Sequence, residues 1–178
     1  MNSVTFAIAA LLAAANSPRP VEVQFVQGTT GRTVTIMVDG RQTRTTFAGK
    51  LGFRERNRSW QSVCGNVRAP MKNGSFFRLK PLSSKQVGGR IALAGNIVAK
   101  YFASARTADQ CAGLQLAVWE AVEDGGDHAD FSAGRFRAAA PAAAIDYAQD
   151  FYEAITDAKE AAFLESQDNG GQDQFSTT

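Results

Sequence analysis

A glutamine stands in the middle of an otherwise apolar stretch, "CAGLQLAVWEAVEDGG", at residues 111–126. At helical spacing this stretch places Cys111, Gln115, Val118 and Val122 on one face. A primary carboxamide carries two hydrogen-bond donors and an acceptor, and burying it without partners costs about 1–3 kcal/mol. Gln115 therefore needs either backbone partners or a chemical use.

A cysteine offers that chemical use, because a thiolate that attacks the carboxamide carbon expels ammonia and leaves a thioester. The chain has two cysteines, Cys64 and Cys111. Cys64 lies in a predicted strand, 115 − 64 = 51 residues before Gln115, whereas Cys111 is one helical turn before it on the same face. Side-chain directions favour Cys64 as the partner and make Cys111 a small buried residue near the site.

The segment "LQLAVW" at 114–119 resembles the T-Q-x-A-x-W-type signature of bacterial thioester domains. These domains occur in surface adhesins, and a related form occurs in exported proteins with PEP-CTERM sorting signals. Gln115, Ala117 and Trp119 carry the most specific part of the resemblance, which runs over 34–174 and includes "TTFAGKLGF", "SVCGN" and "DFSAGRFRA". Leu114 departs from the family, whose adhesin members usually have threonine there.

The resemblance implies a thioester between Cys64 and Gln115 that forms without a cofactor. It also implies a single reaction with an amine, which would attach the protein covalently to a target surface. That amine would belong to a protein lysine, a polyamine or an amino sugar. Such a protein is an adhesion domain that reacts once per molecule, and it is not an enzyme.

Two other functions stay open. In a non-reactive secreted binding or structural module, Gln115 would bond to strand backbone, and the cysteines would form a disulfide or remain thiols. Replacing Gln115 by alanine would then be near neutral or stabilising. In a Cys/His acyl-transfer enzyme or hydrolase, Cys64 would be the nucleophile and His128 the base. With one histidine and no CxxC pair, the sequence predicts no metal site.

The pattern of elements predicts an α+β fold, with N-terminal antiparallel β-strands followed by three α-helices packed on them. Strands are expected at 21–26, 34–38, 59–64 and 75–82, with a tight hairpin at Asp39-Gly40 and a turn at "KNGS". Helices are expected over 90–104, from a capping box of Thr107 and Gln110 to 125–126, and from 141 to 162.

The chain divides into three expected segments. Residues 1–15 have the apolar run and small-residue end of a secretory signal peptide, the alternative being a buried first helix. Residues 16–168 form a single domain, and 169–178 a polar tail that is loose apart from Phe175. The expected product is a monomer, secreted or at the cell surface. A net charge of +2 gives no reason to expect a nucleic-acid partner, and the apolar run is too short to span a bilayer.

Overall fold

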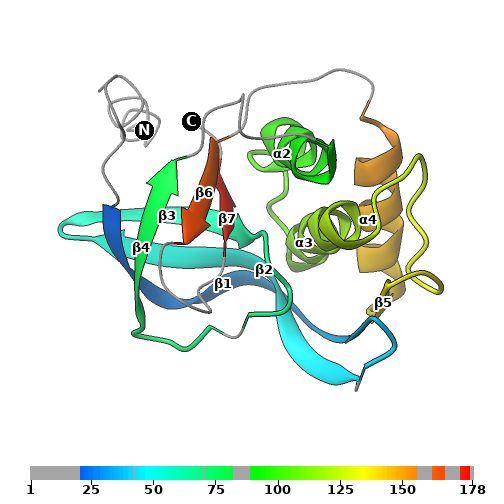
Figure 1. Cartoon of the computed structure of the whole chain (residues 1–178), viewed down its shortest axis with the longest axis horizontal. Helices are drawn as coiled ribbons and strands as arrows, with labels where there is room; N and C mark the ends of the chain where they lie inside the picture. The colour runs from blue at the N-terminus through cyan, green and yellow to red at the C-terminus, as the bar shows by residue number, and fades with distance from the viewer. Residues whose placement is uncertain are drawn as a thin grey trace.

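The computed structural model describes residues 21–41, 43–69, 71–81, 89–155, 162–166 and 173–176. Most strands gather on one side of the molecule and three helices on the other, with β5 (Phe136–Ala139) below α4 (Ala142–Glu153) on the helix side (Figure 1). This confirms the α+β class and the order of antiparallel strands followed by helices. The expected signal segment at 1–15 lies outside the described residues.

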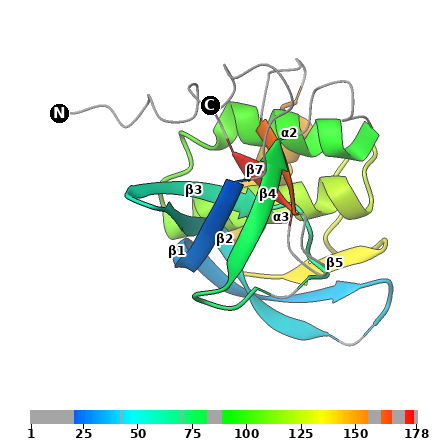
Figure 2. The same ribbon diagram turned by 60° about the vertical axis from the view of Figure 1, so that its left-hand side comes forward.

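Seven strands form one antiparallel sheet in the described part of the chain. They are β1 (Val21–Val38), β2 (Arg44–Glu55), β3 (Arg58–Cys64), β4 (Phe76–Pro81), β5 (Phe136–Ala139), β6 (Ala162–Ser166) and β7 (Gln174–Ser176). The order is β2-β3-β7-β6-β4-β1-β5, and β1 also pairs with β2, so six of the strands close into a ring. Figure 2 shows β1 and β4 side by side.

Strand β1 is long enough to pair with three neighbouring strands. Its start pairs with β4, its middle with β2 and its end with β5. The sequence predicted two separate strands here, at 21–26 and 34–38. The structure instead carries the strand through this region with two register shifts against β2. A Cβ at Gly31 would lie 2.1 Å from the Ala48 carbonyl oxygen, so glycine permits the close approach of the two strands.

The predicted turns are confirmed. Asp39 and Gly40 have φ values of 53° and 65°, the pair of positive angles that a tight hairpin requires between β1 and β2. In "KNGS", the Ser75 N–H donates to the Lys72 carbonyl at 3.0 Å and Gly74 has a φ of 80°.

Three helices cover one side of the strands (Figure 1). They are α2 (Gly89–Tyr101), α3 (Ala108–Glu123) and α4 (Ala142–Glu153). The predicted capping box is present, since Thr107 accepts from the Gln110 N–H and the Gln110 side chain accepts from the Thr107 N–H. Helix α3 is buried nearly all round, between α2, α4 and the strands. Gly113 lets α4 approach, because a Cβ there would lie 2.9 Å from the Ala144 carbonyl oxygen.

Two predictions about the C-terminal part were wrong. The third helix ends at Glu153, and Ala162, expected on its stripe, begins β6. The tail predicted to be loose contains β7, whose three residues are buried and pair with both β3 and β6. Strand β5 was also missed. None of the helices in the described ranges has the length and apolar character that a bilayer crossing requires.

Candidate functional site

Cys64 is the last residue of β3, at a point where the strand has lost one neighbour. Pairing between β2 and β3 stops at Leu51 and Ser62, two residues earlier. On the opposite edge β3 continues beside β7, and the Gly65 N–H donates to the Asp173 carbonyl at 2.7 Å. Alternation along a strand then points the Cys64 N–H and C=O toward the edge that β2 has left. Both groups are buried and need partners.

The side chain of Gln115 supplies both partners. The Cys64 N–H donates to Gln115 Oε1 at 2.8 Å, and Gln115 Nε2 donates to the Cys64 carbonyl at 2.8 Å. The carboxamide therefore continues the β-ladder where β2 ends, and it ties α3 to β3. Gln115 is 1% exposed and Cys64 is 2% exposed, so the pair is removed from water.

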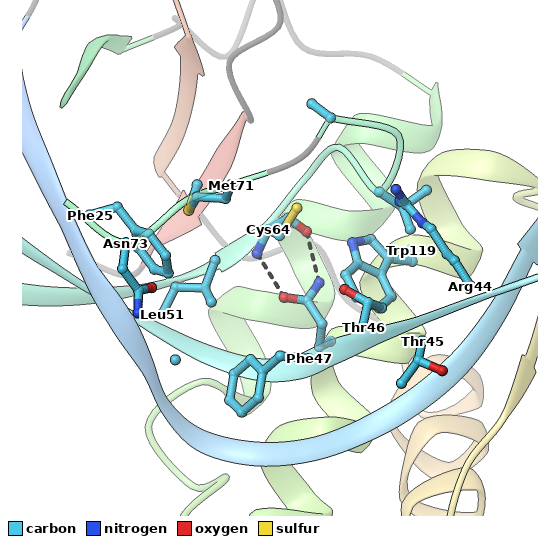
Figure 3. A pocket seen from close by; sticks show the side chains of 14 residues that line it. Phe25, Arg44, Thr45, Thr46, Phe47, Leu51, Cys64, Met71, Asn73 and Trp119 are labelled. Atoms are coloured by element: carbon cyan, nitrogen blue, oxygen red, sulfur yellow. Dashed lines mark hydrogen bonds between the residues drawn. The ribbon is translucent and has the colours of Figure 1, made fainter. Parts of the chain in front are cut away.

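The Cys64 thiol is turned away from that hydrogen-bonded ring. Its Sγ donates to the Asn66 carbonyl at 3.2 Å, and Figure 3 shows the sulfur on the far side of the residue from the two dashed bonds. Burial raises the pKa of the thiol to about 12 from its ordinary 9.0. The thiol is therefore neutral near pH 7.

Trp119 lies one helical turn beyond Gln115 and faces the same site. Its indole N–H is buried and makes no hydrogen bond within ordinary limits, yet it is close enough to the Cys64 sulfur to lower the pKa of that thiol. An unpaired buried donor beside a sulfur is placed to stabilise negative charge on that sulfur. Trp119 thus places a hydrogen-bond donor beside the Cys64 sulfur from the side of α3.

A cavity of about 380 Å³ opens onto the pair. It lies between the β1–β2 hairpin, the loop after β3 and α3, and Figure 3 looks into it. Its lining is mostly apolar and neutral polar: Phe25, Gly28, Arg44, Thr45, Thr46, Phe47, Leu51, Cys64, Val67, Ala69, Met71, Asn73, Gln115 and Trp119. Because Cys64 and Gln115 both line the cavity, a small molecule in it would lie against this pair.

The other residues singled out from the sequence lie elsewhere. Ala117 is fully buried in α3 and does not line the cavity. Cys111 is a buried free thiol whose Sγ donates to the Ala105 carbonyl at 3.4 Å, and no disulfide joins it to Cys64. His128 is exposed in the loop after α3 and is not among the cavity residues, so the structure does not bring it to Cys64.

A buried carboxyl group on α3, that of Glu120, also lies outside the cavity. Glu120 is 2% exposed, and burial raises the pKa of its carboxyl to about 7. One oxygen accepts from the Asp130 N–H at 3.1 Å and the other has no partner. Because Glu120 faces the loop after α3, it is not placed to act as a base toward Cys64.

Arg44 lines the cavity, but it was not among the site residues expected from the sequence. It begins β2, shortly after the Asp39-Gly40 turn, and nothing in the pattern "RQTRTTF" separates it from other exposed arginines. Its proximity to Cys64 follows only from how the β1–β2 hairpin lies against α3. Among the described residues, no group of histidine, cysteine and carboxylate side chains could hold a metal ion.

Comparison with known proteins identifies no relative: no family model, no curated protein and no solved structure matches this chain.

Proposed function

We propose that this chain is a thioester domain, in which Cys64 and Gln115 form an internal thioester that captures an amine on a target surface. One observation supports it above the others. The Gln115 carboxamide is held at both of its polar atoms by the backbone of the cysteine proposed to attack it. The proposed setting is an exported or surface-attached protein, and the amine belongs to a surface ligand.

Thioester formation needs one rotation and one proton transfer. Rotation about the Cα–Cβ bond of Cys64 takes Sγ from the Asn66 carbonyl toward the carboxamide carbon of Gln115. As the S–C bond forms, negative charge develops on Oε1, which already accepts from the Cys64 N–H at 2.8 Å. That N–H therefore serves as a preorganised oxyanion donor. The thiol proton passes to the Gln115 nitrogen, the C–N bond breaks and ammonia leaves.

Capture of the target runs in the opposite direction, because an amine of the target replaces the Cys64 sulfur on the Gln115 acyl group. The amine nitrogen attacks the Gln115 carbonyl carbon, a C–N bond forms and the C–S bond breaks. The amine proton passes to the Cys64 sulfur. The raised pKa of that thiol keeps it protonated after release. An amide is more strongly resonance-stabilised than a thioester, which opposes the return reaction. The protein and its target are left joined by an amide, once per molecule.

The same contacts also favour a second function, a non-reactive binding or structural module. In that account, Gln115 serves only to pair the buried N–H and C=O of Cys64, and the thiol remains bonded to Asn66. A near-neutral Gln115→Ala was expected on the premise of a buried amide without partners, but both polar atoms of the amide are paired. Removing the carboxamide leaves two buried backbone groups unpaired, so the variant is destabilised in either account. Its stability therefore does not separate the two functions.

Amine uptake does separate them. Freshly purified protein is incubated with methylamine at neutral pH, and both its mass and its free thiols are followed without reductant. We expect one methylamine added per chain and one thiol released, in the wild type and in Cys111→Ala. Cys64→Ala and Gln115→Glu should take up none, since one lacks the nucleophile and the other presents a carboxylate, a poor electrophile. Wild-type protein that gains no methylamine and frees no thiol is the non-reactive module.

A further inference from the structure

A second cavity adjoins the one at Cys64 and Gln115. It has a volume of about 190 Å³ and is lined by Ile36, Val38, Arg41, Arg44 and Arg68. Arg44 lines both cavities, so the two meet at this side chain. Figure 3 shows Arg44 on the Trp119 side of the first cavity, with Asn73 and Phe25 on the other. A ligand lying across Arg44 would therefore lie between the Cys64–Gln115 pair of the first cavity and the other two arginines of the second, Arg41 and Arg68.

Only part of that positive charge is neutralised within the chain. Arg68 bonds to Asp39 at 2.6 Å and to Glu123 at 2.6 Å, and Arg135 bonds to Asp39 at 2.8 Å. In the described ranges, Arg41 and Arg44 have no carboxylate partner. Asp173 lies near Cys64 on the β7 side, but it does not line either cavity. Among the described residues, the two cavities together thus present two guanidinium groups without a carboxylate partner, and none of their described lining residues is acidic.

This charge arrangement disfavours one class of amine and favours another. A polyamine carries further cationic groups, which Arg41 and Arg44 would repel from the cavity. A carboxylate or phosphate matches the planar donor fork of a guanidinium, which binds such anions through paired hydrogen bonds. The first cavity, lined by apolar side chains, threonines and Asn73, accepts the neutral part of the ligand.

We propose that the amine captured by Gln115 belongs to a ligand that also carries an anionic group a few atoms from its nitrogen, and that Arg44, with Arg41, binds this anion. The inference rests on the proposed thioester and narrows its substrate class. The amine nitrogen bonds to the Gln115 carbonyl carbon, the C–S bond breaks, and the Cys64 sulfur takes the proton. Arg44 acts by holding the anion so that the amine points toward the acyl group.

Three amines of one chain length test the proposal: 3-aminopropanoate, propylamine and 1,3-diaminopropane. They differ at the far end, which is anionic, apolar or cationic. The rate of thiol release and mass gain is measured for each. It is corrected for the fraction of free amine, for the two amino groups of the diamine, and for reactivity toward a small thioester in solution. These corrections leave only the preference that the protein contributes.

For the wild type we expect 3-aminopropanoate to react about fivefold faster than propylamine, the scale of one partly solvated ion pair, with the diamine slowest. Added salt should shrink the ratios. Arg44→Gln should bring them close to one. The matched control Arg54→Gln, an exposed arginine on the same strand outside both cavities, should keep them.

The failures of the two proposals look different. Equal corrected rates in the wild type, a preference for the diamine, or a preference that survives Arg44→Gln would each overturn the anion assignment while leaving the thioester intact. No reaction with any of the three amines, propylamine included, would overturn the thioester and the anion assignment with it.

Discussion

Cys64 and Cys111 are both buried free thiols whose pKa values are raised by burial, but their surroundings differ in what they allow. Cys64 lines a cavity and its backbone holds a carboxamide. Cys111 is fully enclosed, with its sulfur on the Ala105 carbonyl and the ammonium of Lys50 close enough to lower the pKa of its thiol. Burial is common to both, so burial alone does not mark a reactive cysteine. What distinguishes Cys64 is the carboxamide held beside it and the cavity through which a second reactant could enter.

The surroundings of Cys111 have a structural use of their own. Lys50 is 8% exposed, and its ammonium donates to the Phe102 and Ala105 carbonyls at 2.7 Å each. It also lies 4.4 Å from the centre of the Phe102 ring. These contacts tie β2 to the turn between α2 and α3, which positions the start of the glutamine helix. Cys111 packs beside that tie and takes no part in the cavity.

The largest expected difference between the two cysteines is in alkylation, because Cys64 lines the cavity and Cys111 does not. After methylamine treatment, Cys64 is a free thiol in either account of the site. Because its pKa is about 12 instead of 9.0, its thiolate fraction near pH 8 is about a thousandfold below that of an unfolded chain. Iodoacetamide labelling, mapped by peptide mass, should therefore be slow in the folded protein and should keep rising with pH beyond 9.

The raised pKa of Cys64 also determines the direction in which the stability of the folded protein changes with pH. A folded-state pKa raised above the unfolded value contributes stability that is complete below pH 9 and is lost as the pH rises toward 12. Cys111 serves as the internal control, since it is fully buried, lines neither of the two cavities described above and should be labelled more slowly than Cys64. A labelling rate that levels off near pH 9, or Cys111 labelled first, would contradict the distinction between the two sites.

The next difference is in stability. A cross-link that closes the 51-residue span between Cys64 and Gln115 restricts the unfolded chain, so Cys64→Ala should lose about 2–4 kcal/mol of unfolding free energy. Cys111→Ala only removes a buried sulfur and should cost about 1 kcal/mol. Urea unfolding without reductant measures both. Equal losses in the two variants would indicate that no cross-link is present.

The smallest effect on amine uptake is expected from Lys50→Met, a variant that disrupts the region around Cys111 and leaves the Cys64–Gln115 pair intact. Lys50→Met keeps the apolar stem but leaves the Phe102 and Ala105 carbonyls without their donor, at a cost of about 2 kcal/mol. Methylamine uptake at Gln115 should not change, as measured by intact mass at a temperature where the variant is folded. Uptake that is lost in the folded variant would mean that the two regions act as one site.

The parts of the fold that local chemistry specifies were predictable from the sequence. The capping box at Thr107 and Gln110 and the turn at Asp39-Gly40 follow from backbone needs that a few neighbouring residues meet. Strand β7 was missed because three residues in a polar tail become a strand only through pairing with β3 and β6.

The candidate site was predictable only in part, because some of its contacts depend on the pairing of distant strands. The contact between Cys64 and Gln115 was expected from the family resemblance and from side-chain direction. The place of the Gln115 amide on the backbone of Cys64 depends on where β2 leaves β3, which no local pattern encodes. The Arg41, Arg44 and Arg68 cavity joins a hairpin to a distant loop, so it also appears only in the folded chain.

Intact mass of freshly purified protein, taken under denaturing conditions without reductant, tests the thioester most directly. Wild type and Cys111→Ala should each be lighter than the sequence mass by one ammonia, while Cys64→Ala and Gln115→Ala should have the full mass. Peptide mapping should find the loss in a linked pair that contains Cys64 and Gln115. Wild-type protein at its full sequence mass, or lighter by only the two hydrogens of a disulfide, would contradict the thioester.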